Sequence, residues 1–426
     1  MSVDFLTLPT GGPVHLANLT APGCLVGDAA PLVPLDLTLD GGKISDPVPG
    51  ATRVDMRGAM VFPCFVDMHT HLDKGHIWPR TPNPDGSFMG AITAVSADKA
   101  GRWDETDLLP RMTFSLNCAY AHGTRAIRTH LDQFDPKHDA SWPLFSRLRA
   151  DWAGRIDLQA ACLANLEMVD DPDRFVTIAD LIARHDGVLG GLTVPSDRLP
   201  GQLQTFLGAA QDRGLPADFH VDETTDPQVN TLRDIAQAVL DHRFDQPVVV
   251  GHLCSLSTMP EAEALATLDL MAKAGLHVVS LPMCNLYLQD RHPHRTPRNR
   301  GITLVHEMKA RGISVSFASD NTRDPFYAYG DMDMLEVMRE ATRIGHLDHA
   351  DADWTHAFVT TPATACGFAT PSLAPGAPAD LVICRAREWT ELFARPQSNR
   401  IVLRAGVQID RTLPDYSDLD PLMRTA

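Results

Sequence analysis

The stretch Phe65-Val-Asp-Met-His-Thr-His-Leu-Asp73 decides how the rest of the chain is interpreted. Its apolar start is typical of a buried strand, and His69 and His71 stand one residue apart near its end. Side chains alternate between the two faces of a strand, so both imidazoles point to the same side. They can therefore reach one metal ion at the end of a sheet or barrel. A His-x-His pair also occurs by chance in edge strands, so the metal hypothesis needs support from elsewhere in the chain.

The middle of the chain alternates short apolar runs with amphipathic segments. We predict eight strands, over residues 64–71, 125–131, 157–163, 188–194, 217–222, 247–253, 277–281 and 314–319. Helical patterns lie between them, over residues 107–122, 145–152, 203–213, 228–241, 261–274 and 304–311. Eight β/α repeats predict a TIM-like (β/α)8 barrel of the α/β class, whose functional residues gather at the carboxyl ends of the strands. An open doubly wound sheet is the alternative, but no glycine-rich phosphate loop follows the first strand.

Both ends of the chain have a different texture, with short strand-like pieces between Gly and Pro turns. Residues 1–60 contain several such pieces, and residues 379–384 and 400–404 repeat the pattern near the carboxyl end. The two ends can therefore pair, and we expect a small β-sandwich domain formed by both termini. The expected division is residues 1–60 and 371–426 for this domain, with the metal-dependent barrel over residues 61–370.

Composition restricts the partners. The formal net charge of −17 argues against a nucleic-acid polymer, because its phosphates would be repelled. No apolar run approaches the roughly 18 residues of a membrane span, and the amino-terminus lacks the pattern of a secretory signal. The eight cysteines include no Cys-x-x-Cys pair, which predicts reduced thiols rather than disulfides or a zinc ribbon. We expect a cytoplasmic protein without a membrane partner, which forms a homo-oligomer.

Further polar residues stand at the ends of other predicted strands. His220 lies near the end of the fifth strand with Glu223 three residues later, His252 near the end of the sixth, and Asp320 after the eighth. Singly, each fits a structural role, because strand-end histidines are often polar core residues and strand-end aspartates often cap helices. Together they favour a metal centre, since the carboxyl ends of barrel strands meet on one side.

This set of side chains indicates metal-assisted hydrolysis. Imidazoles and a carboxylate suit Zn²⁺ or Fe²⁺ better than Mg²⁺ or Ca²⁺, which prefer oxygen ligands. Three histidines and Asp320 leave room for a water molecule whose pKa the metal lowers. Glu223 can then move protons between that water, the substrate and the leaving group. His252 can polarise the attacked centre or orient the hydroxide.

Longer motifs resemble the amidohydrolase superfamily, in particular its cytosine deaminase-like branch. The resemblance covers nearly the whole chain. At superfamily level it rests on residues 63–73 and on Gly376-Ala-Pro-Ala-Asp-Leu-Val-Ile383. Three more specific stretches are similar to cytosine deaminases or to N-isopropylammelide amidohydrolases, namely residues 218–223, residues 286–291 with 300–308, and residues 318–325 with 330–332.

The resemblance implies a (β/α)8 barrel with a small β-domain and one divalent metal ion, Zn²⁺ or Fe²⁺. The implied metal ligands are His69, His71, His220 and Asp320. It assigns proton shuttling to Glu223 and a place beside the hydroxide to His252, so that Glu223, His252 and Asp320 are the expected catalytic residues. The predicted fourth strand offers no lysine of the metal-bridging kind, so a mononuclear site is expected.

Departures from the cytosine deaminase pattern concern substrate binding. Asn165 stands where those enzymes carry a glutamine, and Asn321 where they carry a second aspartate. An amide both donates and accepts hydrogen bonds, which changes the preferred ring edge. Lys74 is similar to the triazine-type enzymes and either contacts substrate or is a solvated charge at the rim. Phe326 either stacks on a planar ring or anchors its loop.

We therefore predict an aminohydrolase that deaminates a free pyrimidine-like base, cytosine or a close analogue, and releases ammonia. Lys74 and Asn321 favour an alternative, hydrolysis of a cyclic amide or of an N-alkyl-amino triazine. A third possibility is a catalytically silent barrel that binds a ligand or partner, against which the complete ligand set argues. His130, at the end of the second predicted strand, is expected close to the metal ligands without being one. The loop around Trp78 and Phe88 either closes over the site or only covers the barrel mouth.

Overall fold

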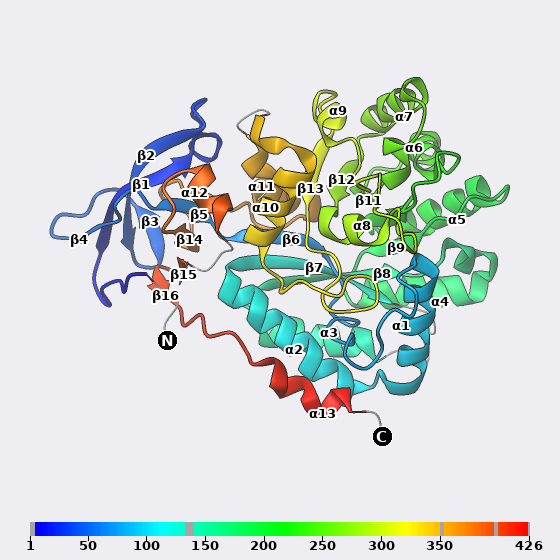
Figure 1. Cartoon of the computed structure of the whole chain (residues 1–426), viewed down its shortest axis with the longest axis horizontal. Helices are drawn as coiled ribbons and strands as arrows, with labels where there is room; N and C mark the ends of the chain where they lie inside the picture. The colour runs from blue at the N-terminus through cyan, green and yellow to red at the C-terminus, as the bar shows by residue number, and fades with distance from the viewer. Residues whose placement is uncertain (1–4, 133–139, 350–352, 396–398, 425–426) are drawn as a thin grey trace.

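The fold is of the mixed α/β type and contains two groups of strands (Figure 1). The computed structural model describes residues 5–132, 140–349, 353–395 and 399–424. The first group consists of eight parallel strands, β6 (Phe65–Thr70), β7 (Thr124–Asp132), β8 (Asp157–Leu163), β9 (Leu189–Leu192), β10 (Ala217–Val221), β11 (Val248–His252), β12 (His277–Ser280) and β13 (Ser314–Phe317). All eight strands expected from the sequence are thereby confirmed.

These parallel strands follow one another in chain order. β6, β7 and β8 form one sheet, and β9 to β13 form a second. Parallel bridges join Ala161 to Val188 and Asn165 to Leu192, which connects the two sheets at β8 and β9. A further parallel bridge joins Thr70 to Asp320 and connects β6 with the segment that follows β13. The carboxyl ends of the first and last strands thus lie side by side.

Helices alternate with these strands. They are α1 (Phe88–Arg102), α2 (Glu105–His122), α3 (Ser141–Asp151), α4 (Pro172–Arg184), α5 (Leu199–Asp212), α6 (Thr231–His242), α7 (Glu261–Ala274), α8 (Pro282–Leu288), α9 (Val305–Lys309), α10 (Met334–Gly345) and α11 (Thr360–Cys366). Local signals set their ends: Asp104 caps α2 by accepting from two backbone N–H groups, and Gly123 ends it with φ +101°, a conformation that favours glycine. α6 begins later than expected, because Asn230 is its N-cap.

Strands from both ends of the chain share one sheet. Its members are β1 (Val14–Pro22), β2 (Leu32–Asp40), β3 (Lys43–Ser45), β4 (Thr52–Asp55), β5 (Met60–Pro63), β14 (Leu381–Cys384), β15 (Arg400–Arg404) and β16 (Val407–Gln408). The central pairing is antiparallel, with Leu381 opposite Pro63 and Cys384 opposite Met60. The expected pairing of the two termini is therefore observed, while the two-sheet sandwich stays a prediction.

The last part of the chain leaves this sheet and returns to the body of the molecule. Figure 1 shows it running along α2 to the short helix α13 (Asp420–Met423). The guanidinium of Arg411 donates to the carbonyl of Ala121, at the end of α2, at 2.7 Å. Arg80, in the loop after β6, donates to the carbonyl of Leu422 at 3.1 Å. Among the described helices, none combines the length and apolar character that a membrane crossing requires.

Candidate active site

Three histidines and one aspartate converge at the carboxyl ends of β6, β10 and β13. The Nε2 atom of His220 lies 3.1 Å from that of His69 and 3.5 Å from that of His71. An oxygen of Asp320 lies 3.1 Å from Nε2 of His71 and 3.6 Å from Nε2 of His69. All four residues are buried, with at most 5 % of each exposed. The sequence therefore identified four residues that the fold brings into contact.

The donor atoms of this cluster fit a divalent cation. Burial lowers the pKa of His69, His71 and His220 well below the ordinary value, so their imidazoles are neutral and have lone pairs to offer. Within the described residues, neither carboxylate oxygen of Asp320 has a hydrogen-bond partner. Burial raises the pKa of Asp320 to about 7, which a bound cation would counteract. Neutral nitrogens that face one another beside a buried carboxylate are donors of the kind that divalent transition metals prefer.

His130, which we expected near the metal ligands, lies in direct contact with them. It belongs to β7, and its ring centroid is 4.0 Å from that of His69. One nitrogen of each of His69, His71, His130 and His220 falls within 4.8 Å of the others. Nε2 of His130 also lies 3.1 Å from a carboxylate oxygen of Asp218, which accepts at 2.8 Å from Arg128. The buried side chains of Arg128, Asp218 and His130 are thus linked in a row beside the cluster.

Glu223 and His252 lie beside the cluster and close to each other. Oε1 of Glu223 is 3.5 Å from Nδ1 of His252. Burial raises the pKa of Glu223 well above its ordinary value, and the nearby Asp320 carboxyl raises it further. Both effects favour the protonated form of the Glu223 carboxyl, the form that can donate a proton. Burial lowers the pKa of His252 to about 3, so its ring is neutral.

Asn285, which the sequence reasoning missed, links these two residues. Its Nδ2 atom lies 3.0 Å from Nδ1 of His252 and 3.4 Å from Oε1 of Glu223. Both neighbours can accept, so the amide donates, and the proton of the His252 ring then resides on Nε2. That Nε2 atom is buried and has no partner among the described residues. Asn285 lies on α8, four residues before Gln289, which donates to the backbone carbonyl of Glu223 at 3.0 Å. In the sequence, the only indication of this role was that Asn285 directly precedes residues 286–291, the stretch similar to cytosine deaminases.

Lys74 and Phe326 form one side of a cavity of about 200 Å³. Only 4 % of Lys74 is exposed, so it is not a solvated rim charge. Its Nζ atom lies 3.4 Å from a carboxylate oxygen of Asp132 and 4.6 Å from the ring centroid of Phe326. Burial alone would lower the pKa of Lys74, but Asp132 and Asp324 raise it overall, so the side chain is a buried cation.

The two asparagines also line this cavity, together with the catalytic candidates. Oδ1 of Asn165 accepts from the backbone N–H of Glu167 at 3.0 Å, which leaves its amide nitrogen for a ligand. Nδ2 of Asn321 donates to Asp324 at 2.7 Å. Nδ2 of Asn165 makes no hydrogen bond to another described residue, and Nδ2 of Asn321 keeps one N–H after its bond to Asp324, so both amides can donate to a ligand.

Comparison with known proteins identifies the family. Residues 158–410 match the family described as "Amidohydrolase family". A pterin deaminase of Rhizobium rhizogenes is 48% identical to this chain over 99% of its length and 100% of the relative's. The chain belongs to the amidohydrolase family. The resemblance seen in the sequence and the assignment as an amidohydrolase-type enzyme are both confirmed.

Solved structures agree with this membership. This amidohydrolase matches a 5-methylcytosine deaminase from Klebsiella pneumoniae liganded with 5-fluorocytosine, with a TM-score of 0.80 and 25% identity over 93% of this chain and 97% of the other. It also matches an N-isopropylammelide isopropylaminohydrolase from Burkholderia multivorans, with a TM-score of 0.76 and 24% identity over 94% and 100% of the two chains.

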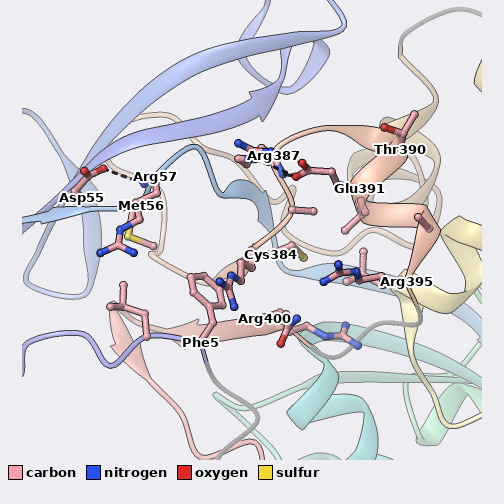
Figure 2. Close-up of a pocket in the computed structure, with 17 residues that line it drawn as sticks. Phe5, Asp55, Met56, Arg57, Cys384, Arg387, Thr390, Glu391, Arg395 and Arg400 are labelled. Carbon is pink, nitrogen blue, oxygen red and sulfur yellow. Dashed lines mark hydrogen bonds and ion pairs between the residues drawn. The ribbon is translucent and has the colours of Figure 1, made fainter.

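A second and larger hollow of the amidohydrolase, about 1250 Å³, lies away from the histidines (Figure 2). It is bounded by the sheet of the two termini and by α12 (Trp389–Ala394). The backbone N–H of Arg57 donates to Asp55 at 2.9 Å, and Arg387 pairs with Glu391. No described residue that lines it is a histidine. The candidate active site is therefore the smaller cavity, where the titratable groups converge.

Proposed function

We propose that this amidohydrolase is a pterin deaminase. In the proposed reaction, water replaces the 2-amino group of pterin, and the products are lumazine and ammonia. The observation that carries the proposal is the 48% identity with a pterin deaminase over the full length of both chains. The chemistry is compatible with the cyclic amidine expected from the sequence, because the amino-bearing ring of pterin is an isocytosine. Cytosine itself has no comparable support.

The proposed metal site consists of His69, His71, His220 and Asp320 and holds one Zn²⁺ or Fe²⁺ ion. When bound, such an ion lowers the pKa of a water molecule and makes hydroxide available at neutral pH. The raised pKa of Glu223 suits it to hold a proton, which it gives to the ring nitrogen. It then takes up the proton of the hydroxyl group added to the attacked carbon and passes it to the departing amine, which leaves as ammonia. His252, with its proton on Nε2, donates a hydrogen bond to the oxygen that attacks the amidine carbon.

The proposed substrate-binding residues have distinct tasks. Lys74, a buried cation, donates to an acceptor on the ring, such as its carbonyl oxygen. Asn165 offers its free amide N–H, and Asn321 is held in place by Asp324. Phe326 stacks on the planar ring. The shared cavity supports these assignments, because all four residues line it together with Glu223 and His252.

We propose that the eight parallel strands close as a (β/α)8 barrel over residues 61–370, with residues 1–60 and 371–426 as the small β-domain. The bridges at both junctions between the parallel sheets support closure. A cytoplasmic location is supported by the eight cysteines, all of which are free thiols. The homo-oligomer stays a prediction, which light scattering would check.

The alternative reaction, hydrolysis of an N-alkyl-amino triazine, has one specific observation in its favour. An N-isopropylammelide isopropyl amidohydrolase of a Pseudomonas species is 20% identical over 69% of this chain and 72% of that protein. This similarity is much weaker and shorter than that to the pterin deaminase. A ligand-binding protein without catalysis is disfavoured by the complete donor set and by the buried Glu223, whose pKa is raised, beside it.

Substrate turnover by the metal-loaded protein tests the proposal. The purified chain, loaded with Zn²⁺ or Fe²⁺, is offered pterin, isocytosine, cytosine and N-isopropylammelide, and ammonia and isopropylamine are measured. We expect ammonia and lumazine from pterin, with cytosine a much poorer substrate. Release of isopropylamine without pterin turnover would contradict the proposal and favour the triazine reaction.

A further inference from the structure

One wall of the active-site cavity is an apolar helix face that the catalytic assignments do not use. Phe88, Ile92 and Val95 of α1 all line the cavity. Their spacing, i, i+4 and i+7, places them on one face of the helix. Leu163 and Leu192, from the ends of β8 and β9, line the same cavity. The apolar wall, defined as these five residues, offers no hydrogen-bonding side chain to a ligand, and the hydroxyl of Ser96, four residues after Ile92, lines the cavity beside it.

The apolar wall is fixed at both ends of α1. Ser87 caps the helix by accepting from the backbone N–H of Gly90 at 2.9 Å. Just before it, Asn83 donates to the carbonyl of Pro325 at 3.0 Å, and the ring of Phe88 packs against Phe326 at 5.7 Å. The helix is therefore tied to the loop that carries a proposed ring-stacking residue.

The other end of α1 is held by buried charges. Asp98 accepts from Arg80 at 2.7 and 3.0 Å and from the indole of Trp103 at 2.9 Å. Lys99 bonds to the backbone carbonyl of Asp132, the last residue of β7. α1 thus lies across the carboxyl end of a central strand, and the position of its apolar face is set by the scaffold.

We propose that this apolar wall receives the second ring of the substrate and selects bicyclic over single-ring aminopyrimidinones. The inference rests on the proposed pterin deamination. The amidine edge of the substrate forms hydrogen bonds with the polar groups around Glu223 and Lys74. The fused second ring of a pterin is flat and carries no N–H donor, so its face and C–H edge match the apolar wall. Its two ring nitrogens are acceptors, which the nearby Ser96 hydroxyl or water can satisfy. A single-ring base leaves the contacts with this wall unmade.

The test compares a bicyclic and a single-ring substrate that share the same amidine. Ile92→Ala removes part of the apolar wall, and Ile92→Trp fills the space beside it. For each variant, kcat/KM is measured for pterin and for isocytosine, whose product is uracil. We expect kcat/KM for pterin to fall about tenfold in Ile92→Ala and further in Ile92→Trp, while isocytosine turnover stays within twofold of wild type. Thr93→Ala, one residue away on the exposed side of α1, is the matched control and should leave both values unchanged.

Direct binding of the two products, measured by calorimetry, gives a second readout that does not depend on turnover. Lumazine is bicyclic and uracil has one ring, so the same variants should weaken the binding of lumazine and leave that of uracil unchanged. Equal changes for both substrates and both products, in a wild type that deaminates pterin, overturn the inference. A wild type that does not deaminate pterin overturns the proposed function instead. The ratio of the two products' dissociation constants then still decides whether the wall favours a bicyclic ligand.

Discussion

Individual residues at the strand ends adopt backbone conformations that few side chains favour. His252 and Leu253 have φ values of +74° and +55°, and Asp320 has φ +63°. Each such residue costs roughly 1–2 kcal/mol of conformational free energy. Two of the three residues are candidates for catalysis or metal binding, and the left-handed turn aims their side chains at the centre of the cluster. This local strain is consistent with a site that the surrounding fold holds in place.

Glu223 offers the most direct residue-level prediction. Glu223→Gln keeps the size of the side chain but removes its exchangeable proton. We expect kcat for pterin to fall by about 10²- to 10⁴-fold with unchanged metal content, measured by ammonia release and elemental analysis. Glu261→Gln, at an exposed position on α7, should behave as wild type. Turnover of Glu223→Gln within a few-fold of wild type would disprove the proton-shuttle assignment.

Asn285 is predicted to act through its neighbours. Asn285→Leu has nearly the same shape but cannot donate to His252 or Glu223, so both lose their fixed orientation. We expect kcat to fall about 10- to 100-fold while KM changes little, and the variant should still bind metal. Asn285→Gln, which retains an amide, should recover part of the activity. A loss confined to KM would show that Asn285 contacts substrate rather than positioning the catalytic pair.

Site residues could be predicted from the sequence where they stand at the ends of strands, and less well elsewhere. His69, His71, His220 and Asp320 could be grouped because parallel strands bring their carboxyl ends together. Asn285 could not, because it lies on a helix and its role depends on how α8 packs over the site. The burial of Lys74 likewise depends on three-dimensional contacts, which a sequence pattern does not record.

Secondary-structure elements close to the site are joined by a few buried charges. Arg80 contacts Asp98 on α1, Asp107 on α2 and the carbonyl of Leu422 on α13. One side chain thus connects two helices and the returning carboxyl-terminal segment. The sequence predicted the strands, because apolar runs are typical of strands. It did not predict the contacts of Arg80, because contacts between distant elements leave no periodic pattern in the sequence. The late start of α6 shows the same limit, because the cap at Asn230 overrides the longer amphipathic pattern.

Removing Arg80 should destabilise this junction. Arg80→Met removes this arginine from the buried carboxylate of Asp98 and leaves Asp107 paired with Arg111 alone. We expect the free energy of unfolding to fall by about 3–5 kcal/mol, measured by denaturant titration. Arg198→Met is the control, because Arg198 is 60% exposed and pairs with exposed acids on the surface, where an ion pair contributes about 0–1 kcal/mol. Equal effects of the two substitutions would show that the junction contributes no more than a surface pair.

For the molecule as a whole, stability should depend on pH through acids that the fold crowds together. Burial, together with Asp333 and Glu340, raises the pKa of Glu336 to about 7, from an ordinary 4.5. Between these pH values the folded protein keeps a proton that the unfolded chain loses. The free energy of unfolding therefore falls as pH rises through this window.

The Glu336→Gln side chain cannot ionise, so the variant does not lose free energy of unfolding through this group as pH rises. We expect the variant's melting temperature to exceed that of wild type by more at pH 8 than at pH 5, measured by calorimetry. Glu263→Gln, at an exposed position on α7, should show no such dependence. A gain for Glu336→Gln that is the same at both pH values would assign the effect to something other than ionisation.

Metal binding should also stabilise the whole molecule, because the proposed ligands come from strands that lie far apart in the sequence. An ion held by His69 on β6, by His71 just after it, by His220 on β10 and by Asp320 after β13 connects both parallel sheets. Such an ion binds the folded state far better than the unfolded chain. At free Zn²⁺ a hundredfold above its Kd, linkage predicts about 2.7 kcal/mol of added stability.

Chelation should therefore lower the melting temperature, and Zn²⁺ should restore it. His71→Asn should abolish the response, while His292→Asn, whose imidazole is 54% exposed, should retain it. A melting temperature that does not respond to Zn²⁺ in wild type would contradict the metal centre and, with it, the hydrolytic mechanism that depends on it.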